Sequence, residues 1–97
     1  MKKCIFYSIV RENGKVIAKQ QKGYTDGVFN YYSNAGTWFA IYPKVGMSIK
    51  TAYKRKDAAA AANNPETLKQ LERALERDNG RAAEKFNTLL AAAKGAI

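Results

Sequence analysis

The sequence predicts an α+β domain: an antiparallel sheet of four to five strands over residues 3–53, followed by three helices. Up to residue 56 the chain is rich in aromatic and β-branched residues separated by glycine turns, which is typical of strands. From residue 57 onward, alanine and leucine recur at helical spacing. The charge changes at the same point, because residues 1–56 hold eleven cations and two anions whereas residues 57–97 are neutral overall. We therefore expect a single domain over residues 1–97, with a basic, aromatic β half (1–56) and a neutral helical half (57–97).

A β-hairpin is expected at the start of the chain. Residues 4–10 are almost wholly apolar and predict a strand buried on both faces. The Asn13-Gly14 pair that follows is a strong signal for a two-residue turn. This turn sets the pairing, so that Glu12 faces Lys15 and the two opposite charges close the hairpin. The second strand continues through the polar residues 19–22, whose far end we expect to lie in solvent or against a ligand.

The next strands are bounded by turns rich in glycine and asparagine. Turn signals at residues 25–27 and 33–36 flank a short strand expected at 28–32. Residues 37–42 predict a further strand, and a turn at 43–46 leads into a last strand at 47–53. In that last strand, alternation places Met47, Ile49, Thr51 and Tyr53 on one face. One face of the strand should pack on the core while the other meets water or a partner.

Three helices are expected after the sheet. The alanine run at residues 58–62 has high helix propensity, and its small side chains allow a helix to approach the sheet closely. Asn64-Pro65 predicts the start of a second helix, with asparagine as its N-cap. That helix carries a leucine stripe at residues 68, 71 and 75 and ends at Gly80, which suits a left-handed cap. A third helix runs from Arg81 to near residue 95, and the short link predicts that the last two helices form an antiparallel helical hairpin.

Composition excludes much catalytic chemistry. The chain has no histidine, which removes the commonest general base and the commonest metal ligand. Cys4 is the single cysteine, so an intrachain disulfide is impossible, and a reducing compartment is expected. The first ten residues imitate a signal peptide faintly, but Arg11 and Glu12 follow at once without a cleavage site. We expect a cytoplasmic protein that is not an enzyme, with no catalytic residues, no metal and no cofactor.

The basic, aromatic half predicts contact with a nucleic acid, either DNA or RNA. Lysine and arginine contact phosphates, and aromatic rings stack on bases. Aromatic residues also favour strands for other reasons, and lysines protect sheet edges, so a merely solvated basic surface is the alternative. On an open sheet face, the residues expected to hold phosphates are Arg11, Lys19, Lys22, Lys44, Lys50, Lys54, Arg55 and Lys56. Those expected to stack on bases are Tyr31, Tyr32, Trp38 and Tyr42, some of which must belong to the core.

Residues around the junction of sheet and helices resemble a pattern found in small phage and mobile-element proteins. These proteins carry a tryptophan strand, a glycine turn, a returning strand and then Thr-Arg-Lys-Glu-Ala or similar; the matching positions are Trp38, Gly46 and residues 54–58. A related layout occurs in the arm-binding domain of integrase-type tyrosine recombinases, where three strands and a helix place the sheet against DNA. The resemblance covers about a quarter of the chain. The chain departs from it with Lys54 in place of threonine and a tyrosine-rich insertion before Trp38.

A second hypothesis is a phage-encoded inhibitor of a host defence nuclease complex, of the anti-CRISPR or anti-restriction type, that acts by protein–protein binding. Its basic face would dock in an acidic groove or cover a site that handles nucleic acid. The tyrosine-rich loop from Tyr24 to Gly36 would suit such an interface, because tyrosine often anchors binding hot spots. The helical hairpin carries balanced charge, so its leucine stripe predicts core packing or a homodimer rather than recognition of DNA. No segment suggests contact with a membrane.

Overall fold

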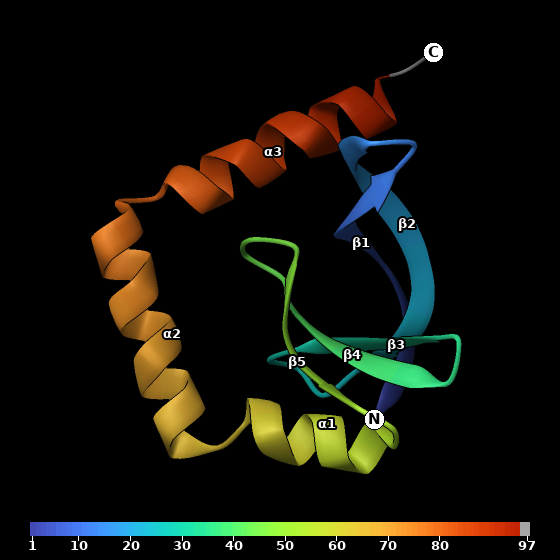
Figure 1. The fold of residues 1–97 in the computed structure, drawn as a ribbon, viewed down its shortest axis with the longest axis vertical. Coiled ribbons are helices and arrows are strands. Elements are labelled where there is room, and N and C mark those ends of the chain that lie inside the picture. The colour runs from blue at the N-terminus through green and yellow to red at the C-terminus, as the bar shows by residue number, and fades with distance from the viewer. Residues whose placement is uncertain (96–97) are drawn as a thin grey trace.

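Each strand of the sheet pairs with the strand that precedes it in the chain, and three helices follow (Figure 1). The structure, a computed structural model, describes residues 1–95. Its elements are β1 (Lys2–Glu12), β2 (Lys15–Thr25), β3 (Asn30–Asn34), β4 (Thr37–Tyr42), β5 (Met47–Ala52), α1 (Arg55–Ala62), α2 (Pro65–Asp78) and α3 (Arg81–Lys94). All neighbouring strands are antiparallel. The predicted α+β class, with five strands before three helices, is therefore confirmed.

The β1–β2 hairpin has the predicted turn and register. Asn13 and Gly14 both adopt positive φ, at 51° and 77°, as a two-residue hairpin turn requires. Glu12 lies opposite Lys15, and pairing continues without a break to Lys2 and Thr25. The side chain of Glu12, however, forms its ion pair with Lys19 rather than with Lys15. The hairpin is thus longer than expected and is closed by a different lysine.

β1 is buried on one face only, contrary to the prediction. Phe6 and Ser8 are buried, whereas Ile5 between them is 61% exposed. β1 is an edge strand of the sheet, and only one of its faces packs on the core. Its Phe6 face packs against Tyr32 and Ile41 of the central strands, while the Ile5 face looks outward. This exposed face carries the candidate site described below.

The hairpin crosses the rest of the sheet at Gly23. β2 and β3 share only two residue pairs, and beyond them the hairpin leaves the three-stranded unit of β3, β4 and β5 (Figure 1). A Cβ atom at Gly23 would lie 1.9 Å from the carbonyl oxygen of Tyr31, so the backbones meet in a space that only glycine fits. Farther along β1, the Ile9 amide donates a hydrogen bond to the Gly46 carbonyl at 2.7 Å. The sheet is therefore folded over itself.

Alanine lets α1 lie close to the other face of the central strands. Ala58 and Ala62 are fully buried in a cluster with Phe29, Tyr31 and Ala40. The close approach predicted for the alanine run is confirmed. A β-bulge at Ile49, which has no partner in β4, shifts the register of β4 and β5 between Ala40 and Ile41. As a result Ile49 and Ala52 both pack on this cluster, and the strict alternation predicted for residues 47–53 is wrong.

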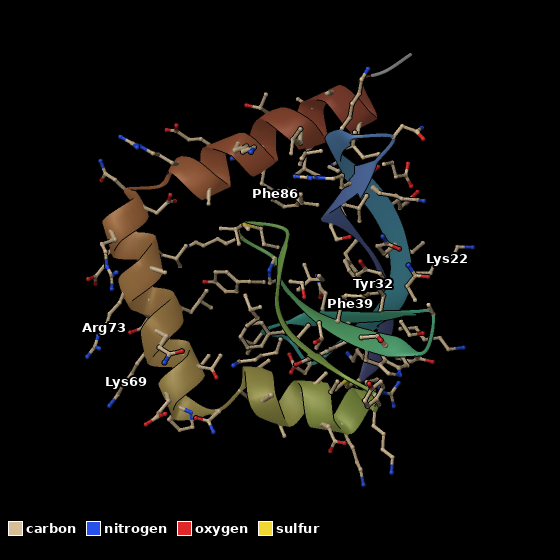
Figure 2. The ribbon with its side chains drawn as sticks, viewed as in Figure 1. Lys22, Tyr32, Phe39, Lys69, Arg73 and Phe86 are labelled. Atoms are coloured by element: carbon tan, nitrogen blue, oxygen red, sulfur yellow. The ribbon has the colours of Figure 1, made fainter. Side chains whose placement is uncertain are left out.

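α2 and α3 meet at a corner instead of forming the predicted antiparallel hairpin. Figure 1 shows the two helices along different sides of the molecule, in contact only near their link. Asn79 and Gly80 both have positive φ, at 55° and 81°, so Asn79 caps α2 and Gly80 begins the turn into α3. The Asp78 carboxylate accepts a hydrogen bond from the Ala82 amide at 2.6 Å and holds this corner. Phe86 of α3 is then buried against the turn at Gly46 (Figure 2).

The leucine stripe of α2 faces the interior. Asn64 caps the helix as predicted, because its side chain accepts a hydrogen bond from the Glu66 amide at 2.9 Å. Leu68 and Leu71 pack, half buried, on the cluster around Phe29. The outer face of α2 carries Lys69 and Arg73, which point away from the sheet (Figure 2). Among the described residues, no helix is both long and apolar enough to cross a membrane.

Replacing Gly23 by alanine should destabilise the fold more than replacing Gly36. Gly23→Ala forces a methyl group into the Tyr31 carbonyl, and we expect a loss of at least about 2 kcal/mol in the free energy of unfolding. Gly36→Ala is the control, because space is open there and only its positive φ is strained, costing about 1 kcal/mol. Urea denaturation measures both. Equal losses would show that the crossing at Gly23 is not tight.

Candidate nucleic-acid interface

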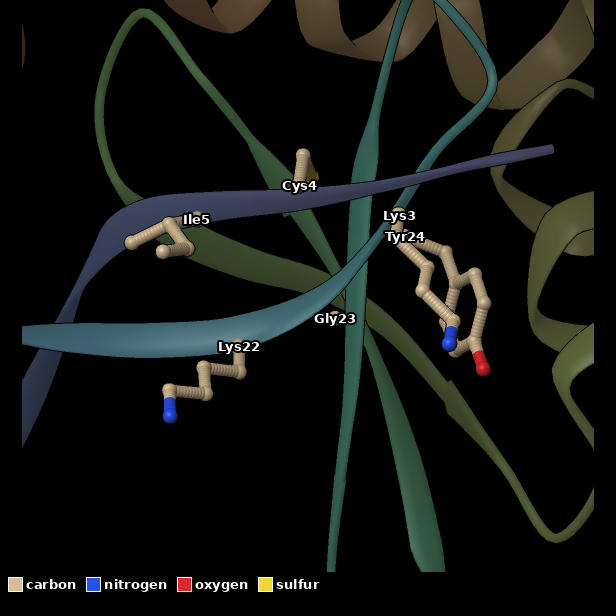
Figure 3. A pocket seen from close by; sticks show the side chains of 6 residues that line it. All are labelled: Lys3, Cys4, Ile5, Lys22, Gly23 and Tyr24. Atoms are coloured by element: carbon tan, nitrogen blue, oxygen red, sulfur yellow. The ribbon is translucent and has the colours of Figure 1, made fainter.

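A hollow of about 390 Å³ lies on the exposed face of the β1–β2 hairpin (Figure 3). Four side chains frame it in two cross-strand pairs: Lys3 lies opposite Tyr24, and Ile5 lies opposite Lys22. Alternate residues of a strand share a face, so these four side chains project from the same side of the hairpin. The hollow thus has apolar walls from Ile5 and Tyr24, with one ammonium group beside each of them.

Arg55 extends this surface toward α1. Its guanidinium carbon lies 4.2 Å from the centre of the Tyr24 ring and 5.8 Å from that of Trp38. The centres of the two rings are themselves 6.1 Å apart and the rings are tilted by 50°, so the three side chains form one cluster. Cation–π contacts hold the guanidinium plane in place. Its N–H groups still point outward in the plane and remain suited to a phosphate.

The junction between β5 and α1 adds an exposed aromatic ring and two further cations. Tyr53 is 88% exposed, the most exposed of the large hydrophobic residues in the described chain. It follows Ala52, whose Cα pairs with that of Trp38, and it lines a separate shallow hollow with Thr37 and Thr51, two residues before Arg55 in the chain. Lys54 and Lys56 flank Arg55 in the chain and are exposed. We call Lys3, Ile5, Lys22, Tyr24, Tyr53, Lys54, Arg55 and Lys56 the hairpin–helix surface.

The cations of the hairpin–helix surface have no carboxylate partner within the described residues. Between residues 1 and 95 the structure forms one ion pair, between Lys19 and Glu12 at the other end of the hairpin. The hydrogen bond that Lys19 donates to the Glu12 carboxylate and the negative charge of Glu12 raise the pKa of Lys19. The ammonium groups of Lys3 and Lys22 are free of such pairing. They are therefore available to neutralise an external anion.

The structure gathers about half of the predicted phosphate-binding residues. Lys22, Lys54, Arg55 and Lys56 belong to the hairpin–helix surface, beside the predicted stacking residue Trp38. The remaining predicted cations lie elsewhere: Arg11 and Lys19 near the hairpin turn, Lys44 in the β4–β5 turn, and Lys50 beside the start of α2. The eight cations therefore do not share one face. The bulge and the fold of the hairpin over the sheet separate them.

Two predicted stacking residues are core residues. Tyr31 is fully buried, and Tyr32 is buried in a stack on Phe39 with ring centres 5.2 Å apart. Figure 2 shows Tyr32 and Phe39 inside the molecule, while Lys22 points out. Tyr42 is half buried and packs on Phe29 at 5.8 Å between ring centres. The expectation of an open sheet face for stacking is wrong, because β1 covers one side of the central strands and α1 the other.

Residues Lys3, Ile5, Tyr24 and Tyr53 were absent from the predicted site, although one signal pointed to three of them. The register imposed by the Asn13-Gly14 turn places Lys3 opposite Tyr24 and Ile5 opposite Lys22 if both strands extend that far. The polar residues 19–22 were expected to meet solvent or a ligand, and Lys22 is exposed to solvent. No sequence signal indicated that Arg55 would stack on Tyr24.

Asp26 ties the β2–β3 loop to the C-terminal end of α1, the helix that begins at Arg55. One carboxylate oxygen accepts hydrogen bonds from the amides of Val28 and Phe29 at 2.9 and 2.7 Å. The other accepts from the Tyr31 hydroxyl at 2.6 Å and from the Asn63 side chain at 2.9 Å. Asn63 follows the last residue of α1. Four donors from two distant segments therefore converge on this carboxylate.

The hydrogen bonds around Asp26 change two pKa values. Partial burial raises the pKa of Asp26, but the donors outweigh it, led by the Phe29 amide and the Tyr31 hydroxyl, and the net pKa lies below its usual value. Burial and the neighbouring carboxylate both raise the pKa of Tyr31.

Burial likewise raises the pKa of the Cys4 thiol. A raised pKa disfavours the nucleophilic thiolate.

No group of three or more carboxylates and thiols is placed to hold a metal ion within the described residues.

Comparison of the chain with protein-family models, with curated proteins and with solved structures gives no significant match. The order of β3, β4, β5 and α1 is three strands followed by a helix, the order that the resemblance to arm-binding domains implies. The relationship itself stays a prediction.

Replacing Asp26 by asparagine should destabilise the protein in a pH-dependent way. Asparagine has a single acceptor oxygen, so it cannot accept both from the Val28 and Phe29 amides and from the Tyr31 hydroxyl, and one of these sets of donors loses its acceptor. We expect a loss of about 1 kcal/mol at pH 7, at the low end for such a change because Asp26 is partly exposed. A lowered folded-state pKa stabilises the fold above the unfolded-state value, near 4, and this stabilisation disappears as pH falls through the folded-state value.

Urea unfolding of wild type and Asp26→Asn from pH 7 to pH 2.5 measures the effect, and the two curves should converge at the acid end. Tyr31→Phe provides the control, because it removes the hydroxyl that donates to Asp26. In this background the Asp26→Asn change should cost less, as expected for coupled residues. A constant difference at all pH values would contradict the assigned role of the carboxylate.

Proposed function

We propose that this chain is a non-catalytic nucleic-acid-binding protein that holds phosphates on the hairpin–helix surface. One observation carries the proposal: Lys3 and Lys22 line an apolar hollow, Arg55 lies over the Tyr24 ring that forms one of its walls, and none of these cations has a carboxylate partner within residues 1–95. Cations that replace the counterions of a polyanion release them, which drives binding. The net charge of +9 would also speed the encounter with a polyanion.

The positions of the acidic groups support a binding rather than a catalytic role. Catalysis of phosphoryl transfer by metal ions uses convergent carboxylates. Glu12 is engaged by Lys19 next to the hairpin turn, and Asp26 is occupied by four donors beyond the far end of β2. The two acids of the basic half thus lie at opposite ends of the hairpin. We expect no enzymatic activity.

The rival proposal is an inhibitor that binds a protein of a nuclease complex. The loop from Tyr24 to Gly36 was expected to supply its anchors, but Phe29, Tyr31 and Tyr32 in this segment are buried in the core. Val28, which is about half exposed, and Tyr24, which already belongs to the hairpin–helix surface, remain the large apolar residues that the loop offers to a partner. The leucine stripe of α2 likewise faces the interior, so a homodimer through it has less support than core packing. Nucleic-acid binding is therefore the better-supported proposal.

Removing two cations from the hairpin–helix surface should weaken binding to nucleic acid. We expect Lys3→Gln/Lys22→Gln to lower the affinity about tenfold at 0.1 M salt and to make the log–log salt slope shallower by roughly one to one and a half. The measurement is fluorescence anisotropy with labelled single-stranded DNA, duplex DNA and RNA between about 50 and 300 mM salt. Both substituted side chains are exposed, so the fold should be unaffected.

Lys69→Gln/Arg73→Gln is the matched control, because it removes the same charge from the outer face of α2 (Figure 2). This variant should bind within about twofold of wild type, since its distant charges act only through a screened field. Equal weakening by both variants would show that net charge, rather than this surface, governs binding. Absence of binding to any of the three nucleic acids at the lowest salt would overturn the proposal and favour a protein partner.

A further inference from the structure

We infer that the hairpin–helix surface is built for single-stranded nucleic acid, with one unstacked base seated in the hollow between Lys3 and Lys22. The inference rests on the proposed function and narrows its substrate class. The hollow measures about 390 Å³ and is open to solvent on the exposed side of the hairpin (Figure 3). A flat apolar group with a charged linker on each side matches this arrangement, and a nucleotide in a single strand has that chemistry.

The chemistry of the walls selects a base rather than phosphate alone. A site that only neutralised a duplex backbone would need cations and polar donors, because the phosphates that it contacts present no apolar surface. Here Ile5, 61% exposed, and Tyr24 form the walls between the two lysines. In a duplex, base faces are covered by stacking, whereas a single strand can splay a base onto an apolar or aromatic wall. The apolar walls therefore favour the single strand.

The hollow is held in shape before any ligand binds. Arg55 lies 4.2 Å over the Tyr24 ring, and Trp38 packs against the same ring at 6.1 Å between centres. At the base of the hollow, Gly23 is fixed by its close approach to the Tyr31 carbonyl. A preformed site reduces the entropy lost on binding. The Arg55 guanidinium, held by the ring, is placed at the rim for the next phosphate.

Tyr53 supplies a second stacking surface on the same path. It is 88% exposed and lies between the β4–β5 pair at Trp38 and the cations Lys54 and Arg55. Nothing in the described chain covers this ring, and a ring beside cations is the arrangement that sequence-tolerant single-strand binders use. The strand would therefore run from the hollow, past Arg55, to Tyr53. This order alternates aromatic or apolar contacts with phosphate contacts.

The test compares three DNA probes, each 12 nucleotides or 12 base pairs long, by fluorescence anisotropy at 0.15 M salt. The probes are a labelled 12-nucleotide oligothymidine, a 12-base-pair duplex, and a 12-nucleotide strand whose central six positions are abasic. We expect the oligothymidine to bind at least about tenfold more tightly than the duplex, given the stacking contributed by each base. The abasic strand keeps its phosphates but lacks the central bases, so it loses the stacking contacts. Its affinity should therefore fall to the level of the duplex.

The substitutions Ile5→Ser and Tyr53→Ser together remove apolar contact without changing charge, and both side chains project into solvent. The double variant should lose roughly tenfold in affinity for oligothymidine while its salt slope and its affinity for duplex stay unchanged. Met47→Ser is the control, because Met47 is also exposed and apolar but begins β5, away from the hollow. It should bind all three probes as the wild type does.

The possible failures are distinguishable. If duplex, abasic and oligothymidine probes bind equally well, and Lys3→Gln/Lys22→Gln weakens all three, nucleic-acid binding stands and the single-strand inference is wrong. The same conclusion follows if Ile5→Ser/Tyr53→Ser leaves oligothymidine binding unchanged. If neither these probes nor a 12-nucleotide RNA binds at 50 mM salt, both the inference and the proposed function are wrong. Thermal unfolding of each variant, monitored by circular dichroism, verifies that every protein tested is folded.

Discussion

The close approach of Gly23 to the Tyr31 carbonyl is the constraint on which the rest of this structure depends. It lets the long hairpin leave the plane of the three central strands after only two shared residue pairs. β1 can then fold across those strands, where Phe6 covers Tyr32 and Ile41. Because the Phe6 face of β1 packs on the central strands, the opposite face, which carries Ile5, is exposed. The glycine at position 23 therefore allows both the closure of the core and the formation of the exposed hollow.

A second constraint places the helices relative to that hollow. The Asp26 carboxylate gathers donors from its own loop and from Asn63 at the end of α1. Buried alanines bring α1 down onto the central strands, so that Arg55 at its first turn reaches the Tyr24 ring. Both ends of this eight-residue helix thus make contacts with the sheet and its loops. A guanidinium fixed in this way binds an anion with less loss of side-chain freedom than a mobile lysine.

Local sequence signals predicted what depends on neighbours in the chain. The Asn13-Gly14 turn determined the register of β1 and β2, because only that turn type suits two residues of positive φ. Asn64-Pro65 determined the start of α2, and the alanine run predicted a helix that lies close to the sheet. The basic character of the first half also follows from the sequence alone. These features need no knowledge of long-range packing.

Tertiary structure decided which side chains remain available for function. Tyr31 and Tyr32 are as aromatic as Tyr24 and Tyr53, yet the first two are buried because β1 and α1 cover both faces of the central strands. The direction of α3 was equally hidden, since two residues of positive φ turn a predicted helical hairpin into a corner. By itself the sequence determined the elements, the hairpin register and the basic charge. The hairpin register brings Lys3 and Lys22 to one face, but only tertiary packing decided that Arg55 lies over the Tyr24 wall of their hollow, because that contact depends on how the hairpin and α1 pack in space.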